Sequence, residues 1–324
     1  MTRLGNISDQ GRSRRKRTLG HLDLECPPLP HTLFEAMRLV DNHDLAEHAR
    51  VVSLAENDPL VSVRILRMVN SAYFGFSRTV EDVDRAVRLL GPASVAGIVM
   101  GMNVIRLQST MDGPAGVLFG QLIRHSLATA RLGDRLWSKL DPTADSRRAF
   151  NAGVLHDFGK ILLVYNYPED ARQLYETPES RSPVEWLAAE TALFGCSHLE
   201  AGKHASENMD FPAEIRAQLC GKQEGDLALI VEAADAGARA LGLAFNEPLD
   251  WDTCAALDVW DRLVASFPFR SGEREDLIEF VQGCKEDIES YVFQLLRRRT
   301  DRSGTPTGPQ HGPSGPRRST DRAA

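Results

Sequence analysis

The sequence predicts an all-α fold, and two observations support this prediction. Almost every periodic segment between the two ends of the chain spaces its apolar residues as one face of a helix requires. Alternating runs of β-branched residues that are long enough to form a strand are missing. With 324 residues, 42% of them hydrophobic and 26% charged, the chain can form one large globular domain or two modest ones.

The segment DPLVSVRILRMVNSAYFG, residues 58–75, is the first predicted helix. Asp58 can cap its N-terminus, and Pro59 suits the first helical position because no backbone N–H is needed there. Gly75 would adopt the left-handed conformation past the last turn. The apolar residues expected on one face are Leu60, Val63, Leu66, Val69 and Tyr73. A shorter helix, VDRAVRLL, should end at Gly91–Pro92.

A histidine lies on the apolar face of the predicted helix LFGQLIRHSLATARLGDRLW, residues 118–137. Steps of three and four residues place the following side chains on one face: Leu118, Leu122, His125, Thr129, Leu132 and Leu136. His125 should therefore point into the core. It is either a hydrogen-bonded core residue or a metal ligand.

The stretch FNAGVLHDFGK, residues 150–160, places His156 and Asp157 side by side in an apolar helical run. Gly153 and Gly159 are the helical neighbours of His156, and we expect their small size to leave a hollow beside the ring. Asp157 follows about 100° further around the helix. It can share a metal ion with His156, or it can form an ion pair with Lys160.

A third polar position is Asp235, which lies among alanines in DLALIVEAADAGARALG. A carboxylate in such apolar surroundings needs a partner, and Arg239 one turn later is the simple choice. The alternative is a shared site built by His125, His156, Asp157 and Asp235. Two imidazoles and two carboxylates suit a single divalent ion such as Mn, Fe, Mg or Zn.

The order H…HD…D of these residues resembles the ligand series of the HD superfamily of metal-dependent phosphohydrolases. The surrounding motifs resemble the HDOD domain, the HD-related output domain of bacterial signalling proteins, from about residue 25 to 245. These motifs, in chain order, are CPPLP, LAENDPLVSVRILRMVNSAYFG, AVRLLG, AGVLHDFGK and ETALFGCSHLEAGKHASENMDFP.

The resemblance implies a two-lobed helical domain. Its N-terminal helical bundle would span residues 25–114 and its HD-type bundle residues 115–245. A helical extension would follow at 246–296. Its expected role is either dimerisation or partner docking, or completion of the core. Residues 1–24 and 297–324 are expected to be disordered basic tails, the second because Gly, Pro, Ser and Thr dominate it.

The resemblance further implies a regulatory or scaffolding module that acts through signalling partner proteins. All four ligand positions are retained, which keeps a metal-dependent phosphohydrolase as the alternative. Lys160 would then steady a phosphate oxygen, and His198 would donate a proton or support the metal from outside. The paired histidines of the related HD-GYP phosphodiesterases fall at Lys222 and Gln223, and a GYP sequence is missing. Cyclic-dinucleotide hydrolysis is therefore not expected.

Charge and cysteine content limit the kinds of partner and the cell compartment expected for the protein. Residues 1–20 and 297–324 each carry a net charge of +5, so the formal total of −7 leaves −17 on residues 21–296. An acidic body argues against nucleic-acid binding except weakly through the basic tails. Five scattered cysteines without a CxxC pair favour reduced thiols in the cytoplasm. The apolar stretches are too short for a membrane span, which needs about 20 residues.

Overall fold

The computed structural model describes most of the chain between residues 46 and 296. The described ranges are 24–25, 46–71, 78–91, 113–143, 146–177, 183–208, 225–268 and 270–296, with single positions between 95 and 111 and at 216 and 219. The predicted basic tails lie outside these residues apart from Leu24, as do Tyr73, Gly75, Lys222 and Gln223.

Every regular element of the described ranges is a helix, which confirms the predicted all-α class. The helices are α2 Ala46–Glu56, α3 Pro59–Val69, α4 Val83–Leu90, α6 Gly113–Leu140, α7 Arg147–Leu155, α8 Phe158–Asn166, α9 Pro168–Tyr175, α10 Pro183–Phe194, α11 His198–Asn208, α13 Asp226–Ala238, α14 Trp251–Ala255, α15 Val259–Ser266, α16 Arg274–Gly283 and α17 Lys285–Leu296. One turn of π-helix, Arg239–Leu243, continues α13.

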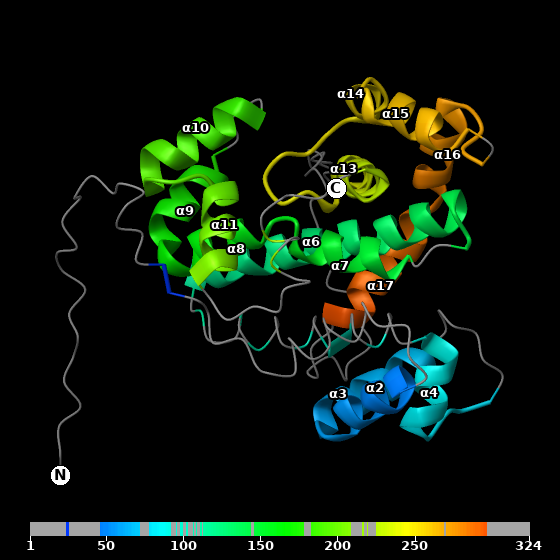
Figure 1. Ribbon diagram of the computed structural model, residues 1–324. Helices are drawn as coiled ribbons and strands as arrows, with labels where there is room; N and C mark the ends of the chain where they lie inside the picture. The colour runs from blue at the N-terminus through cyan, green and yellow to red at the C-terminus, as the bar shows by residue number, and fades with distance from the viewer. Residues whose placement is uncertain are drawn as a thin grey trace, which may run out of the picture.

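The long helix α6 is the centre of the arrangement (Figure 1). It packs against α7, α13 and α17, and α8 packs against α11. Helices α2, α3 and α4 form a separate small group below it in Figure 1, and α17 runs between this group and α6. The division into lobes at residues 114 and 245 remains a prediction.

The predicted start of α3 and the predicted end of α4 are confirmed. The Asp58 carboxylate accepts hydrogen bonds from the backbone N–H groups of Leu60 and Val61, and Pro59 occupies the first turn of α3. Helix α4 begins after the capping residue Asp82 and ends at Gly91, whose φ of 79° only glycine adopts readily. Local side-chain chemistry therefore sets both starts.

The predicted apolar face of α3 is wrong. The buried residues are Val61, Ile65, Met68 and Val69, whereas the predicted Leu60 and Val63 are 54% and 47% exposed. Repeated steps of three residues turn by about −60° each, so Leu60 and Val69 lie on opposite sides of the helix. The helix also ends at Val69, with Asn70 as its C-cap, well before the expected Gly75.

Residues 150–165 form two helices and not the single predicted run. Helix α7 ends at Leu155, and α8 begins at Phe158. His156 and Asp157 form the turn between them. The backbone of Asp157 is no longer helical, with φ −104° and ψ 19°. The two side chains are therefore held by a bend, which lets both point to one place.

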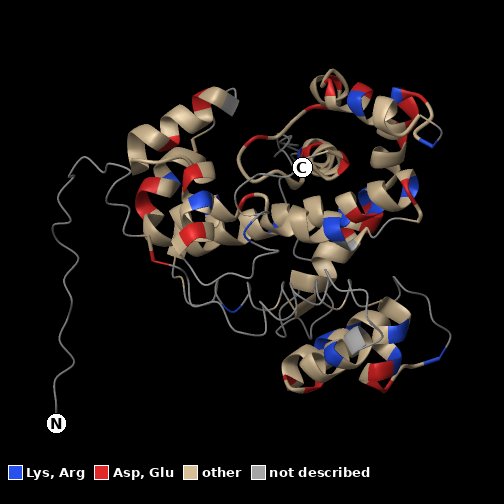
Figure 2. Ribbon diagram, viewed as in Figure 1, with Lys and Arg blue, Asp and Glu red and all other residues tan. Residues whose placement is uncertain are grey.

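Charged side chains of both signs cover the outer helices, as on α9 and α16 (Figure 2). The middle of α6 is largely neutral in the same view. Within the described ranges, no helix is both long enough and apolar enough to cross a membrane.

Candidate metal centre

His125 lies on the predicted apolar face of α6, and all six residues of that face are buried. Its Nδ1 lies 3.0 Å from the carbonyl oxygen of Leu243. A carbonyl only accepts, so Nδ1 carries the proton and donates it, while Nε2 keeps its lone pair. The π-turn after α13 brings this carbonyl to the ring, because the wider turn redirects the chain and Gly242 reverses it at φ 82°.

His156 is fixed in the same way. Its Nδ1 donates to the carbonyl oxygen of Gly153 at 2.7 Å. Its Nε2 is buried and has no hydrogen-bond partner. Gly153 itself faces Ala130 of α6, 2.5 Å from where a Cβ would stand. The glycine therefore permits close packing of α7 on α6, and the expectation that it leaves a hollow beside His156 is wrong.

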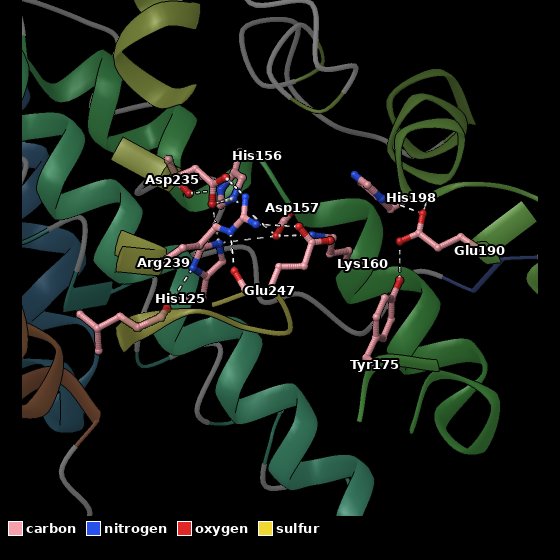
Figure 3. A network of polar contacts seen from close by, with 12 residues as sticks. His125, His156, Asp157, Lys160, Tyr175, Glu190, His198, Asp235, Arg239 and Glu247 are labelled. Atoms are coloured by element: carbon pink, nitrogen blue, oxygen red, sulfur yellow. Dashed lines mark hydrogen bonds and ion pairs between the residues drawn. The ribbon is translucent and has the colours of Figure 1, made fainter. Parts of the chain in front are cut away.

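The four predicted ligand positions come together from α6, the α7–α8 turn and α13 (Figure 3). His125 Nε2 lies 3.0 Å from Asp235 Oδ1, and His156 Nε2 lies 3.8 Å from the same oxygen. Asp157 Oδ2 is 3.4 Å from His156 Nε2 and 3.8 Å from His125 Nε2. Ligand atoms of His125, His156 and Asp235 all lie within 4.8 Å of one another.

This cluster consists of hydrogen-bond acceptors that face one another. In both histidines the Nδ1–H group donates to a backbone carbonyl, so the lone pair on each Nε2 faces the two carboxylates. Such an arrangement can accommodate a cation at its centre. The unpartnered Nε2 of His156 is the sharpest sign that the residues fit a metal ion.

The electrostatics favour the ionised form of both carboxyl groups. Burial alone would raise the pKa of Asp157 and of Asp235. The nearby Lys160 charge for Asp157, and the facing histidines together with the Arg239 charge for Asp235, hold the pKa of each carboxyl well below its usual range. Burial lowers the pKa of His156. Two carboxylates and neutral imidazoles are the forms that bind metals.

Both simple ion pairs expected from the sequence are present beside the cluster. Lys160 Nζ lies 3.0 Å from Asp157 Oδ2, and Arg239 Nη1 lies 3.6 Å from Asp235 Oδ2. Arg239 also binds Glu247, whose Oε2 is 2.8 Å from Nη2. Burial raises the pKa of Glu247. Ion pairing and metal binding are therefore compatible, because each aspartate has two oxygens and several lone pairs.

His198, at the first position of α11, lines the same cavity without joining the ligand group. The cavity has a volume of about 310 Å³ and is lined by the four ligand positions, Lys160, Arg239 and His198, with Trp186 and Phe245 as aromatic walls. Gly159, which was expected to open space beside His156, faces the backbone of His198 and Gly202 and permits contact between α8 and α11.

Glu190 is the most informative residue that the sequence reasoning missed. It is fully buried on α10 and accepts hydrogen bonds from the Tyr175 hydroxyl and from His198. An acid in the apolar run VEWLAAETALF was the available signal. Arg239 was considered only as an ion-pair partner, and Glu247 not at all.

A helical core that gathers two histidines and two aspartates in the order H…HD…D is the arrangement of HD-superfamily domains. The model of one family, the HDOD domain, matches residues 26–223. This match covers more than half of the chain, so the chain belongs to the HDOD domain family, as its motifs predicted.

Individual relatives are distant. An uncharacterised protein of Treponema pallidum (strain Nichols) is 25% identical over 195 residues, which cover 59% of this chain and 36% of that protein. The chain thus spans about a third of the length of this curated relative. The crystal structure of an HDOD domain protein of unknown function from Geobacter sulfurreducens has a TM-score of 0.67 at 20% identity, over 84% of this chain and 93% of that chain.

Two further solved structures share the fold. A candidate signal transduction protein from Marinobacter aquaeolei VT8 has a TM-score of 0.61 at 21% identity, over 85% of this chain and 60% of that chain. A candidate metal-dependent phosphohydrolase from Shewanella amazonensis SB2B has a TM-score of 0.52 at 17% identity, over 83% of this chain and 93% of that chain. At these identities the similarity establishes the fold alone.

Proposed function

We propose that this chain is a signal-transduction module of the HDOD family whose core holds one divalent metal ion. His125, His156, Asp157 and Asp235 would hold the ion, and Mn, Fe, Mg or Zn suits two imidazoles with two carboxylates. The observation that carries the proposal is the buried Nε2 of His156, which faces acceptors and has no hydrogen-bond partner. The module would work in the cytoplasm by binding signalling proteins, in keeping with the description of the Marinobacter relative.

Metal analysis of the purified protein tests the proposal. We expect close to one ion per chain in the wild type and almost none in a His156→Ala, Asp157→Ala double variant. His204→Ala is the matched control, because His204 is a half-buried histidine of α11 that contacts Asn208 and is absent from the lining of the cavity. Less than a tenth of an ion per wild-type chain after reloading with Zn²⁺ or Mn²⁺ would contradict the metal site.

A metal-dependent phosphohydrolase is the second candidate function. It is favoured by the cavity of about 310 Å³, where Lys160 and His198 lie beside the four ligand positions. A bound ion would acidify a water molecule and polarise a phosphoryl oxygen. In this function Lys160 would hold a phosphate oxygen and His198 would exchange a proton with the ligand. Turnover of phosphomonoesters, nucleotides or cyclic nucleotides with Mn²⁺ or Mg²⁺, lost in the double variant, is the expected result.

Protein partners would dock on the acidic helical body, and the segment 255–296 is the first region to test for docking or homodimerisation. It contains α15, α16 and α17. Pull-down experiments with Phe293→Ser, a change at an exposed position of α17, test this role while keeping the buried side chains of α17. Weak nucleic-acid binding by the tails would show a steep salt dependence that disappears when residues 1–20 and 297–324 are removed.

A further inference from the structure

Glu190 is a charged side chain with no exposure to solvent and a complete set of partners. Its Oε1 accepts from the Tyr175 hydroxyl at 2.8 Å. Its Oε2 accepts from the backbone N–H of His198 at 2.8 Å and from His198 Nδ1 at 2.7 Å. Burial raises the pKa of Glu190, but the hydrogen bonds from His198 outweigh this effect and hold it below its usual value. Glu190 is therefore ionised and accepts hydrogen bonds from both the backbone and the ring of His198.

The backbone of His198 is fixed from two further directions. Ser197 and Glu200 form reciprocal hydrogen bonds at the start of α11, in which each side chain accepts from the backbone N–H of the other. The carbonyl group of His198 also packs on Gly159 of α8, where a Cβ would overlap it. Gly159 lies two residues after Asp157, so His198 has a fixed position relative to the metal-ligand positions.

This support leaves one free nitrogen on the His198 ring. Nδ1 is committed to Glu190, and Figure 3 shows the second nitrogen pointing away from Glu190 and Tyr175. The side chain lines the same cavity as the four ligand positions and Lys160. A buried acid that only satisfied core hydrogen bonds would not require its histidine partner to face a cavity. The support is that of a preorganised binding group.

We propose that Glu190 is a positioning residue that holds His198 with Nε2 facing the cavity, where it accepts a hydrogen bond from a phosphorylated small molecule bound at the metal centre. The inference rests on the proposed metal site and its phosphate chemistry, and it adds the residue that orients His198 toward the ligand. The phosphoryl oxygens would face the ion and Lys160. A hydroxyl of the ligand, such as the P–OH of hydrogen phosphate, would donate to Nε2, because an imidazole with a protonated Nδ1 accepts there.

Binding of inorganic phosphate to zinc-loaded protein, measured by calorimetry, tests the ligand. We expect His198→Ala to weaken phosphate binding by about ten- to a hundredfold, as the loss of a hydrogen bond to a charged group does. Glu190→Gln should weaken it about tenfold, because the amide keeps the shape but loses the charge that orients the ring. His204→Ala, on the same helix, should bind like the wild type. Zinc content and circular dichroism of each variant show that it is folded and loaded.

The tautomer of His198 tests the positioning role without any ligand. Two-bond ¹⁵N–¹H correlation spectra should show the proton on Nδ1 in the wild type, and on Nε2 in Glu190→Ala. An Nε2–H tautomer in the wild type overturns the role of Glu190.

The outcomes also separate the two proposals. If the wild type takes up no zinc, both the proposed metal site and the proposed phosphate binding are overturned. If zinc binds but phosphate does not, or binds equally to His198→Ala, the metal site stands and only the ligand inference is overturned. His198→Ala decides this even if the Glu190 variants fail to fold, since His198 is a cavity-lining residue.

Discussion

Lys160 and Asp157 show how a buried pair can serve the fold and a metal site together. Burial lowers the pKa of Lys160, but the adjacent Asp157 carboxylate outweighs burial and the pKa is raised. The pair is 3.0 Å apart, and the side chains are only 14% and 6% exposed. Both charges are largely shielded from bulk water, so each depends on the other.

Lys160→Met should therefore destabilise the metal-free protein much more than the loaded protein. Without the ammonium group, Asp157 is buried without its main partner, which costs about 3 kcal/mol. A bound divalent ion would supply the missing positive charge. Urea unfolding with EDTA and with saturating Zn²⁺ measures the difference.

Lys203→Met is the control for this prediction. Lys203 and Glu207 form a pair whose side chains are 58% and 59% exposed, so its loss should change little. Equal destabilisation of Lys160→Met with and without metal would show that no ion reaches Asp157.

At this scale the sequence predicted the four ligand positions but not their support. His125, His156, Asp157 and Asp235 could be found because polar residues in apolar helices need partners. Glu190 carried the same signal, but its partner His198 lies beyond a turn, and local spacing does not reveal contacts across turns. The hydrogen bonds from the histidines to Leu243 and Gly153 depend on backbone carbonyls, which the sequence does not distinguish.

Helix contacts at the site depend on single glycines. Gly159→Ala would place a Cβ against the His198 carbonyl and should destabilise the protein by about 1–3 kcal/mol while separating α8 from α11. Gly283→Ala, at the end of α16, meets no atom within 4 Å and should change stability by less than about 1 kcal/mol. Thermal unfolding of both variants gives the comparison, and similar melting temperatures would refute the packing role of Gly159.

The cap of α3 predicts a pH dependence. Burial raises the pKa of Asp58. The hydrogen bond and charge of Arg106, together with two backbone N–H groups, outweigh burial and bring the pKa below the usual 3.8. Because the pKa of Asp58 is lower in the folded protein than in the unfolded chain, its carboxylate stabilises the fold at pH values above the unfolded pKa. This stabilisation is lost as the pH falls through the folded pKa. Asp58→Asn keeps a capping side chain but loses the charge, so it should cost about 1 kcal/mol at pH 7.

The measurement is the free energy of unfolding of wild type and Asp58→Asn between pH 7 and pH 3. The gap between the two proteins should stay constant down to about pH 5 and then narrow. A gap that widens toward low pH would contradict the assigned role of Arg106.

The start of α3, the end of α4 and the buried face of α6 were predicted correctly, whereas the buried face of α3 and the break between α7 and α8 were not. Asp58 acts through a side chain that binds its own helix start, and Pro59 and Gly91 act through their backbone geometry, so their roles can be inferred locally. The buried face of α3 depends on which neighbours pack against it, and a three-residue spacing was too weak a guide. The break at His156–Asp157 has no glycine or proline at the turn itself, so a continuous helix was the natural expectation.

For the whole molecule, α17 joins elements that are far apart in the sequence. It packs on α6 and α3, and Arg64 of α3 donates to the carbonyl oxygen of Leu295. Its buried side chains are Ile288, Tyr291, Val292 and Leu295. Within the described residues α17 therefore completes the core, which is one of the two roles expected for the extension.

Ending the chain after Gly283 should abolish cooperative unfolding. Loss of even one large buried side chain costs about 2–5 kcal/mol, and the removal of four would exceed a typical total stability of about 5–15 kcal/mol. Ending it after Leu296 removes only the predicted basic tail and should leave the melting curve unchanged. Circular dichroism melts of both truncated proteins provide the test, and a cooperative melt of the shorter one would show that α17 is peripheral.

The all-α class could be predicted because helical periodicity repeats along the whole chain. The arrangement of the helices could not, since it depends on contacts such as those of α17 with α3. The lobe boundaries at residues 114 and 245 remain predictions for the same reason.

The π-turn at Arg239–Leu243 makes this short segment sensitive to chain length. Deleting one residue there would restore ordinary helical winding and rotate the next part of the chain by about 100°. The Leu243 carbonyl would then swing away from His125, whose ring could turn over and present the wrong nitrogen to its neighbours. Insertions and deletions should be tolerated better in surface loops, whereas these five residues must keep their number and Gly242 must stay a glycine.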